Sequence, residues 1–351
     1  MAKLKSVVVR NFRNITIKEL TNLEIKNVIT GKNMSGKTNT LNAIHWAFTG
    51  VTLDGSADNR SNFPLKGEES TSVTLDFGDF KFERACEMVD GTPSVSIYVN
   101  GDKATTIKNG EARLHSYLGL TDIILTQPKD FNIVRFLLNP LYFDTISPGA
   151  LRKFLYGLAD LNFNEIAEQQ NQSVVSVIEK YCENDPYKLA DAISKKKKVL
   201  KAEIKTCKDA RALFPSIVDE ATSLEKDKNK ELKVIESDEA LAEKYALRVS
   251  KRANAYYQMA MGLKVCLLEK GVGDDVFKDV CYPILPKSNL PFALGSYAER
   301  SYIGMRFIQE VCLKFNIKPL PILLDNMESL DETTQKFVDN LGVQYIGALV
   351  K

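Results

Sequence analysis

The chain has 351 residues, of which 44% are hydrophobic and 26% are charged, and its formal net charge is +2. This composition is typical of a soluble globular protein, and the length suffices for one large or two ordinary domains. The nearly balanced charge gives no general case for nucleic-acid binding, so any basic surface must be local. No apolar run approaches about 18 residues, and the N-terminus has no apolar signal segment, which disfavours a membrane or secreted protein.

The cysteines and histidines are few and scattered. Six cysteines occur without a C-x-x-C pair, and there are two histidines, His45 and His115. A structural zinc site or a disulfide framework is therefore disfavoured. Reduced thiols in a cytoplasmic protein are the simpler interpretation.

Three strands are predicted near the N-terminus. Residues 4–9 alternate weakly and then become apolar, and residues 15–17 add an edge strand after the basic and aromatic turn at 10–14. Residues 27–30 are β-branched, as a short buried strand should be, and residues 39–48 predict a helix. This last strand and the helix flank the motif around which the chain is organised.

That motif is the loop Gly31–Thr38, which fits the pattern G-x-x-x-x-G-K-[ST] at every fixed position. Gly31 and Gly36 let the backbone turn so that its N–H groups point at phosphate oxygens, and the helix N-terminus adds the positive end of its dipole. Lys37 would reach the β- and γ-phosphates, and the Thr38 hydroxyl would bind Mg²⁺. The loop therefore predicts binding of ATP or GTP, and a turn that binds nothing is the minor alternative. The expected nucleotide contacts are Asn33, Met34, Ser35, Gly36, Lys37, Thr38 and Asn39.

The strand region and the loop together resemble a known family. Leu4–Asn14 followed by Gly31–Asn39 looks like the N-terminal head segment of the SMC, SbcC and RecF group of ABC-type ATPases. The resemblance implies an α/β fold: an ABC-type P-loop ATPase head with a mixed central sheet and an antiparallel β-subdomain, split by a short helical or coiled-coil insertion. It also implies that Arg13 approaches the nucleotide phosphates, with an exposed arginine after a strand as the alternative.

A loop and an antiparallel sheet are expected next. Residues 54–60 lie in a stretch rich in Gly, Ser, Asp and Asn, and they resemble the segment that these heads carry near the nucleotide base. Two turn signals, Asp90-Gly91 and Asn100-Gly101, separate apolar runs as in β-hairpins. The predicted strands are 72–77, 80–87 and 94–99.

Two positions compete for the role of the glutamine with which such heads sense Mg²⁺ and the attacking water. Residues 123–127 predict a strand that ends at Gln127, which has the right side chain for catalysis and metal binding. Asn139 lies nearer to the expected distance before the helix that begins around Ser147. The sequence leaves both open.

The middle of the chain predicts helices. Residues 150–180 have a helical pattern, and 188–213 have apolar residues at a seven-residue spacing, as in a coiled-coil arm. Pro215 breaks this pattern. A charged segment, 219–239, then precedes a helix predicted at 240–269. Two antiparallel helices around the break would form a short hairpin, whose arms of about 25 residues would reach about 35–40 Å.

The run Lys195–Lys198 is the most basic stretch of the sequence. A solvated helix face is the ordinary interpretation of a single charge run. Contact with the phosphate backbone of DNA is the functional alternative, which would need no particular base sequence and would weaken steeply with salt.

A helix start in the C-terminal part resembles the ABC signature sequence. Ser296 and Glu299 form an S-x-x-E capping box, so a plain helix start is a complete local explanation. The resemblance implies in addition that Ser296 closes on the γ-phosphate held by a second head. The chain departs from the family pattern at Tyr297 and Ala298, which replace two glycines.

Residues 320–326 form an apolar strand pattern that ends in an acid. Asp325 resembles the Walker B aspartate, which holds the Mg²⁺ shell together with Thr38. The next position is usually a glutamate that activates water, but here it is Asn326, which cannot accept a proton. Glu328 would substitute if the turn points it inward. Otherwise the head hydrolyses slowly and works as an ATP-gated clamp.

These assignments predict three parts: the N-terminal half of the ATPase head at 1–165, a helical insertion at 166–270 and the C-terminal half of the head at 271–351. The expected function is an ATP-dependent DNA-binding or DNA-processing ATPase in recombination, repair or replication. The resemblance implies a homodimer that closes around ATP and binds DNA independently of sequence. A compact, phage-encoded member of the group fits the length, and DNA cleavage would need a separate nuclease subunit.

Two functions of another class are the alternatives. In the first, ATP binding assembles a regulatory or anti-phage protein complex, with little hydrolysis and no direct DNA substrate. In the second, the chain is a P-loop kinase for a small molecule. The kinase is disfavoured because the split architecture and the Ser296 segment would have no use there.

Overall fold

The computed structural model describes residues 3–57, 59, 70–126, 131–213, 216, 218–273 and 275–350. The chain forms two compact units, Met1–Ala150 with Leu285–Lys351, and Leu151–Ile284. The first unit therefore joins the two ends of the chain, and the second is inserted between them. The limits of the insertion predicted from the sequence, 166 and 270, both fall inside the second unit.

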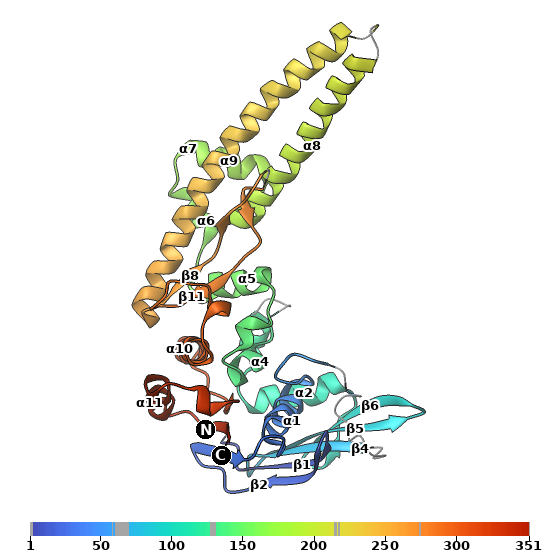
Figure 1. Ribbon diagram of the computed structural model, residues 1–351, viewed down its shortest axis with the longest axis vertical. Helices are drawn as coiled ribbons and strands as arrows, with labels where there is room; N and C mark the ends of the chain where they lie inside the picture. Colours follow the sequence, from blue (N-terminus) through green and yellow to red (C-terminus); the bar gives the residue numbers. More distant parts are fainter. Residues whose placement is uncertain are drawn as a thin grey trace. The chain divides into compact units, whose positions relative to one another are not determined.

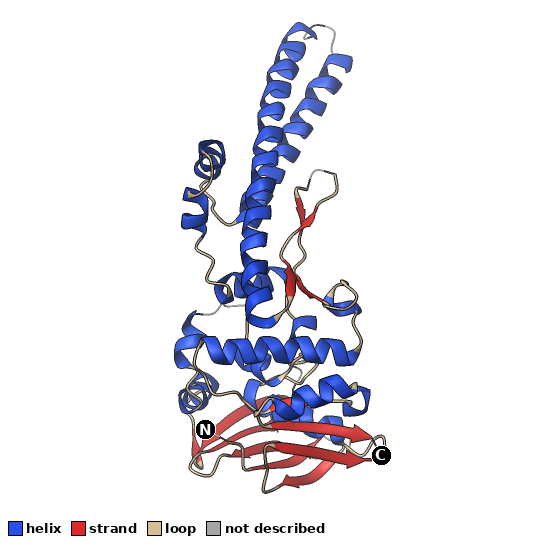
Figure 2. Ribbon diagram, turned by 90° about the vertical axis from the view of Figure 1, so that its left-hand side faces the viewer, coloured by secondary structure: helices blue, strands red, loops and turns tan. Residues whose placement is uncertain are grey.

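The first unit contains a six-stranded antiparallel sheet (Figure 2). In spatial order its strands are β2 (Ile15–Leu20), β1 (Ser6–Phe12), β4 (Ser70–Asp76), β5 (Lys81–Val89), β6 (Thr92–Val99) and β7 (Asp102–Lys103). Buried apolar residues alternate with more exposed polar ones, as a sheet with one covered face requires. Val9 of β1 pairs with Val73 of β4, and both are fully buried. The predicted α/β fold with an antiparallel β-subdomain is confirmed.

A parallel sheet positions the phosphate loop. It consists of β12 (Ile322–Leu324), β13 (Tyr345–Val350) and β3 (Lys26–Gly31), in this order. β13 lies between the other two, so that Gly347 pairs with both Leu324 and Val28. Because the carboxyl ends of parallel strands meet at one edge, the residues that follow β3 and β12 lie close together there.

Helices of the first unit cover these sheets. α1 (Lys37–Thr49) begins in the phosphate loop and is buried along most of its length, with Trp46 and Phe48 in the core. The strand predicted at 123–127 is wrong, because the described part of this segment is helical; a short apolar run cannot be told from a buried helix by its pattern alone. The other helices are α2 (Ile107–Tyr117), α3 (Thr121–Thr126), α4 (Ile133–Leu138), α10 (Tyr297–Lys314) and α11 (Glu332–Asn340), with 3₁₀ turns η2 (Tyr142–Asp144), η4 (Phe292–Leu294) and η5 (Met327–Ser329).

Helix α10 packs closely on the segment that follows α4. A Cβ atom at Gly304 would lie 1.8 Å from the carbonyl oxygen of Pro140, so a larger residue does not fit without movement of the backbone. Met305, Phe307 and Ile308 of the same helix are buried. The contact therefore fixes α10 against residues that line the candidate site.

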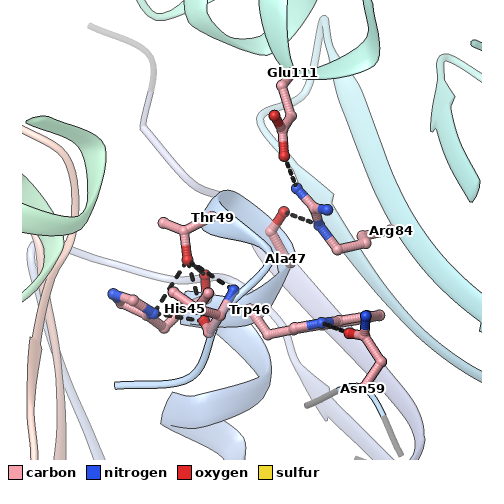
Figure 3. A network of polar contacts seen from close by, with 8 residues as sticks. His45, Trp46, Ala47, Thr49, Asn59, Arg84 and Glu111 are labelled. Carbon is pink, nitrogen blue, oxygen red and sulfur yellow. Dashed lines mark hydrogen bonds and ion pairs between the residues drawn. The ribbon is translucent and has the colours of Figure 1, made fainter. Parts of the chain in front are cut away.

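A buried arginine ties the antiparallel sheet to the C-terminal end of α1 (Figure 3). Arg84 of β5 donates from Nε to the carbonyl oxygen of Ala47 at 3.1 Å and pairs with Glu111 at 2.7 Å. Its guanidinium also lies over the ring of Trp46, whose Nε1 donates to Asn59. A cation at this end of a helix is favourable because the helix dipole is negative there. Burial lowers the pKa of Arg84, and the charge of Glu111 opposes that shift.

His45 of α1 is fully buried. Its ring lies beside Thr49 (Figure 3). Its Nδ1 lies 2.7 Å from the carbonyl oxygen of Val51, and since a carbonyl only accepts, Nδ1 carries the proton. Nε2 has no hydrogen-bond partner among the described residues. Burial is the main reason that the pKa of His45 falls from 6.5 to about 4. The charge of Arg135 lowers this pKa as well.

The second unit is built on a helical hairpin (Figure 1). Its arms are α8 (Pro186–Leu213) and α9 (Val218–Met261), of 28 and 44 residues. The predicted hairpin is therefore present, but with a longer second arm. The charged segment 219–239 and the helix predicted at 240–269 are one continuous helix that ends at Met261. Buried residues such as Ile235 and Ala242 recur along it, and most charged side chains lie on its other faces; the buried Asp238 pairs with Lys180.

Ion pairs occupy the basic run on α8. They are Lys195–Asp191, Lys196–Glu231, Lys197–Glu239 and Lys198–Asp275. Two of the carboxylates belong to α9, so the run contributes to the pairing of the arms. Each of the four lysines has a carboxylate partner, and the run therefore offers no unneutralised charge for DNA.

Shorter elements complete the second unit. Buried Arg152 joins several of them, because its Nε donates to the carbonyl oxygen of Leu267, its Nη2 pairs with Asp279, and its guanidinium stacks on the ring of Tyr187 at 3.9 Å. The elements are α5 (Pro148–Leu158), α6 (Phe163–Glu168), α7 (Gln172–Tyr181), β8 (Lys264–Cys266), β9 (Glu269–Lys270), β10 (Phe277–Lys278) and β11 (Tyr282–Ile284). Across the described ranges, no helix is both long and apolar enough to cross a bilayer.

Replacing Gly304 with alanine is expected to destabilise the protein by about 1–3 kcal/mol, because the added Cβ would overlap the carbonyl of Pro140. Gly157→Ala is the matched control: it is also a helical glycine, but no atom lies within 4 Å of the added Cβ. It should leave stability unchanged or raise it by about 0.5–1 kcal/mol. Thermal unfolding measures both, and an unchanged midpoint for Gly304→Ala would refute the close contact.

The pH dependence of unfolding tests the neutral state of His45. Below pH 6.5 the unfolded chain binds a proton that the folded chain takes up only near pH 4, so stability falls as the pH drops through this window. The shift corresponds to about 3 kcal/mol. His45→Asn keeps a donor near Val51 but does not titrate, so its stability should fall less between pH 6.5 and pH 4 in urea titrations. Parallel curves for the two proteins would contradict this assignment.

Candidate functional site

A cavity of about 160 Å³ lies at the edge where β3 and β12 end. There the hydroxyl of Thr38, at the start of α1, donates to Oδ1 of Asp325, which follows β12, at 3.0 Å. The fold thus brings together two predicted site residues that come from opposite ends of the chain. This phosphate-loop cavity is lined by Asn14, Asn33, Met34, Gly36, Lys37, Thr38, Asn39, Asp325, Asn326, Glu328, Ala348 and Val350.

Lys37 is mostly buried beneath the loop that it belongs to. Its Nζ donates to the carbonyl oxygens of Gly31 at 2.8 Å and Lys32 at 2.7 Å. These bonds hold the ammonium group inside the turn, where a phosphate oxygen is a stronger acceptor than a neutral carbonyl. Lys37 is therefore placed to exchange a carbonyl for a phosphate.

The loop backbone depends on left-handed residues. Gly36 has φ 84° and precedes the first residue of α1, a conformation that glycine adopts without a Cβ penalty. Met34 has φ 64°, which is uncommon for a side chain of this kind, and its side chain is 96% exposed. The contribution of Met34 within the described fold is thus through its backbone, while its side chain points to solvent.

A chain of hydrogen bonds braces the loop against the turn between β1 and β2. Arg13 donates to Oδ1 of Asn39 at 3.2 Å, and Nδ2 of Asn39 donates to Oδ1 of Asn14 at 2.8 Å. Asn14 in turn donates to the carbonyl oxygen of Met34 at 3.0 Å. Sequence reasoning assigned no role to Asn14, although it stands next to Arg13 in the segment that carries the resemblance. Its contact with the loop depends on the tertiary fold, which brings the β1–β2 turn next to the loop.

Asn326 and Glu328, in the turn after Asp325, differ in what they can do. Asn326 has φ 51°, a left-handed conformation that asparagine tolerates better than most residues, and its amide cannot serve as a base. Glu328 also lines the phosphate-loop cavity, and its Oε2 accepts the backbone N–H of Val350 at 3.2 Å. The turn therefore places a carboxylate in the cavity at the second position after Asn326.

A second cavity of about 570 Å³ shares Thr38, Asp325 and Asn326 with the first. Asp54 on its wall accepts hydrogen bonds from the Thr52 hydroxyl and the Ser56 N–H, which lower its pKa. The remaining lining residues are Asn42, Leu53, Asn139, Pro140, Leu141, Asp144, Thr145, Tyr297, Arg300 and Leu323. Polar residues from several segments thus line the same cavity as Asp325.

Asn139 lines this second cavity, and both the oxygen and the nitrogen of its side-chain amide are hydrogen-bonded. Nδ2 donates to the carbonyl oxygen of Leu53 at 3.2 Å, and Oδ1 accepts the N–H of Leu141 at 2.9 Å. Asn42 accepts the N–H of Leu53, so two asparagines fix this loop residue. Gln127, the competing candidate, lies outside the described residues.

At the start of α10, the segment that resembles the ABC signature, the hydroxyl of Ser296 is hydrogen-bonded to Glu299. Ser296 Oγ accepts the N–H of Glu299 at 3.2 Å, and Oε2 of Glu299 accepts the N–H of Ser296 at 3.1 Å, so the predicted capping box is complete. The Ser296 hydroxyl also donates to Oε2 of Glu299 at 3.0 Å. The next residue, Tyr297, lines the second cavity, and burial raises the pKa of its hydroxyl. Arg300, one turn further, pairs with Asp144. Ser296 is exposed, whereas Tyr297 and Arg300 face their own head.

The contact between Thr38 and Asp325 has the right donors for a magnesium ion. A hydroxyl and a carboxylate are hard oxygen ligands, and Mg²⁺ in nucleotide sites is held by one or two protein groups together with waters and phosphates. Both side chains lie at the mouth of the phosphate-loop cavity. The residues present therefore fit Mg²⁺ bound with a nucleotide.

Removing the Asn14 amide should loosen the loop and weaken nucleotide binding. Asn14→Ala breaks one hydrogen bond to the Met34 carbonyl and one from Asn39, and a loss of about 1 kcal/mol corresponds to about a five-fold higher Kd for ATP. Asn109→Ala, an exposed asparagine on α2 away from the cavity, is the control. Titration calorimetry measures both. Equal Kd values for Asn14→Ala and the wild type would rule out a bracing role.

Comparison with known proteins identifies a family and several relatives. A family model described as AAA domain matches residues 6–246. The DNA replication and repair protein RecF of Clostridium tetani is 27% identical over 173 residues, covering 49% of this chain and 40% of that protein. RecF of an Exiguobacterium species is 32% identical over 132 residues, covering 38% of this chain and 33% of that protein. The chain thus spans less than half the length of these curated relatives.

A solved structure of the recombination mediator protein RecF with ATP is 17% identical, covers 99% of this chain and 93% of its own, and has a TM-score of 0.47. The family model covers more of this chain than the two RecF sequences do, since it spans well over half of it and includes the phosphate loop. The chain therefore belongs to the AAA domain family, and its resemblance to SMC, SbcC and RecF-type ATPase heads is confirmed by the RecF relatives.

Proposed function

We propose that this chain is an ATP-binding and ATP-hydrolysing protein of the SMC, SbcC and RecF type, whose heads pair around ATP to bind or process DNA in recombination, repair or replication. The observation that carries the proposal is the hydrogen bond between Thr38 and Asp325 beside the buried ammonium group of Lys37. It supports the proposal because the phosphate loop, the hydroxyl and carboxylate that would bind Mg²⁺, and the carboxylate of Glu328 all line one cavity. A cytoplasmic setting fits this role.

Each residue of the cavity has a separate task. The ammonium group of Lys37 leaves the carbonyls of Gly31 and Lys32 and pairs with the phosphates. Thr38 and Asp325 would hold Mg²⁺, which would supply positive charge to neutralise the charge that develops on the phosphates. Glu328 lines the same cavity and accepts the proton of the attacking water in place of the residue at 326.

Pairing of two heads supplies the contact that one head lacks. Ser296 is exposed at a helix N-terminus, where a phosphate is favoured by the dipole and by free N–H groups. Its hydroxyl donates to Glu299, so closing on the γ-phosphate of a second head requires that this bond be exchanged. DNA held by such a dimer would be cleaved only by a separate nuclease subunit.

A second candidate function follows from Asn326. An amide after Asp325 cannot take a proton, and if Glu328 does not replace it, ATP is bound but hydrolysed slowly. The chain would then act as an ATP-gated switch that assembles a protein complex, as in a regulatory or anti-phage system. DNA would not be its substrate.

Sedimentation with ATP separates these functions. The wild type should dimerise with ATP, and Lys37→Ala should stay monomeric because the phosphates lose their cation. Glu328→Gln should accumulate the dimer, since ATP binds but turnover falls by about 10²–10⁴-fold, the usual contribution of a general base.

The control is Glu332→Gln, an exposed acid in the next helix that pairs with Lys336 and does not line the cavity. Its turnover should equal that of the wild type. If ATP dimerises none of these proteins, the pairing of heads is wrong. If Glu328→Gln turns over like Glu332→Gln, Glu328 is not the base and the switch function is favoured.

A further inference from the structure

The C-terminal part of α9 carries four cations and no acid. After Glu243, the helix continues to Met261 with Lys244, Arg248, Lys251 and Arg252 as its only charged residues. All four are exposed. The segment 244–261 is therefore a local basic stretch within a chain whose overall charge is nearly balanced.

Helical geometry places the four cations on one side of α9. They are spaced at i, i+4, i+7 and i+8, which brings side chains to the same face of a helix. The opposite side of this segment is buried, with Tyr245, Ala246, Val249, Ala253 and Tyr257 in the core of the second unit. The basic side chains thus form one solvent-facing stripe, which we call the α9 basic face.

The α9 basic face has no carboxylate partner in the part of the chain that the structure describes. Arg248 and Arg252 reach only the neutral side chains of Gln170 and Gln169, each at 3.4 Å. Lys244 and Lys251 form no ion pair there. By contrast, the run Lys195–Lys198 on α8 is fully paired with acids.

Unpaired like charges one turn apart destabilise a helix by a few tenths of a kcal/mol per pair. The chain neutralises such charges elsewhere on the same hairpin but leaves these four in place. A polyanion that binds along the helix would supply the missing counter-charge, and guanidinium groups bind phosphates with paired hydrogen bonds.

We propose that the α9 basic face binds the phosphodiester backbone of double-stranded DNA. From Lys244 to Arg252 the helix advances about 12 Å, a length over which duplex DNA presents about seven phosphates. The duplex therefore offers at least one phosphate for each of the four cations. Because phosphates are the same at every base pair, this binding does not depend on base sequence. This inference rests on the proposed function, because it names the surface through which the ATPase would hold DNA.

The face belongs to a single chain, so binding needs no nucleotide. Leu247 lies next to Arg248 and is 59% exposed, so an acidic protein segment with apolar side chains is the occupant that the experiment must distinguish from DNA.

The test measures fluorescence anisotropy of a labelled duplex of about 30 base pairs with the whole chain, without nucleotide, between about 50 and 200 mM KCl. In the test variant all four cations become glutamine: Lys244→Gln, Arg248→Gln, Lys251→Gln and Arg252→Gln. The slope of log K against log salt should fall by about three to four, since each phosphate contact contributes about 0.9. The Kd at the lowest salt should rise at least about ten-fold.

The control variant removes the same number of charges from ion-paired positions of the hairpin, namely Lys195→Gln, Lys196→Gln, Lys208→Gln and Arg211→Gln. Its net charge equals that of the test variant, so a loss confined to the test variant reports the local surface. Circular dichroism and ATP-dependent sedimentation of both variants show whether they fold and whether the heads still pair.

Each outcome decides the inference. Equal slopes for the wild type and the test variant, or equal losses in both variants, would overturn it. So would failure of the wild type to bind the duplex while it binds labelled polyglutamate, which would assign the face to an acidic protein. Because sedimentation reports head pairing independently, a failed DNA assay with intact ATP-driven pairing overturns this surface alone, whereas lost pairing in the wild type overturns the proposed function.

Discussion

The hydrogen bond between Thr38 and Asp325 joins residues 287 positions apart in the chain, and the rest of the first unit is arranged so that it can form. β13 lies between β3 and β12 in the parallel sheet, and it sets the two strands side by side with their carboxyl ends at one edge. Without this strand, the loop and the aspartate would not face the same cavity. Hard oxygen donors at one edge of a parallel sheet, beneath a helix N-terminus, form a site suited to Mg²⁺ and phosphates.

The helix that carries the loop is held at both ends. At its start, hydrogen bonds run from Arg13 through Asn39 and Asn14 to the backbone of the loop. At its other end, the guanidinium of Arg84 contacts the last turn and faces the negative end of the dipole. The antiparallel sheet thus supports both ends of α1, because the β1–β2 turn and β5 belong to it. A rigid helix keeps the backbone N–H groups aimed into the cavity.

In the inserted unit, ion pairs between two long helices contribute to the structure. Its two arms are solvated on most faces, and ion pairs such as Lys196–Glu231 and Lys197–Glu239 bridge them where they meet. Lys196–Glu231 is about half exposed and adds little stability by itself, whereas Lys197–Glu239 is mostly buried. Both pairs fix how the arms align. The same hairpin leaves the α9 basic face unneutralised. One long helix therefore carries both charges that hold the hairpin together and charges available to a partner.

The sequence by itself determined the loop Gly31–Thr38, the strand before it, the helix after it and the antiparallel strands, because each depends on local pattern and on residues next to one another. It also indicated Asp325, the capping box at Ser296 and a helical hairpin. The predicted strand at 123–127 was wrong where the structure describes this segment, because a short apolar run is compatible with a strand or a buried helix. The predicted separation of 219–239 from the following helix was also wrong, because both belong to α9.

Only the tertiary structure decided which distant groups meet. The contact of Asn14 with the loop, the presence of Glu328 in the first cavity and that of Asn139 and Asp325 in the second depend on strands and turns that pair across the whole chain. The same holds for the lysines. Whether a basic run is paired depends largely on which acids the fold brings to it. Lys196, Lys197 and Lys198 pair with acids of other segments, whereas Lys244 and its basic neighbours on α9 meet no acid among the described residues.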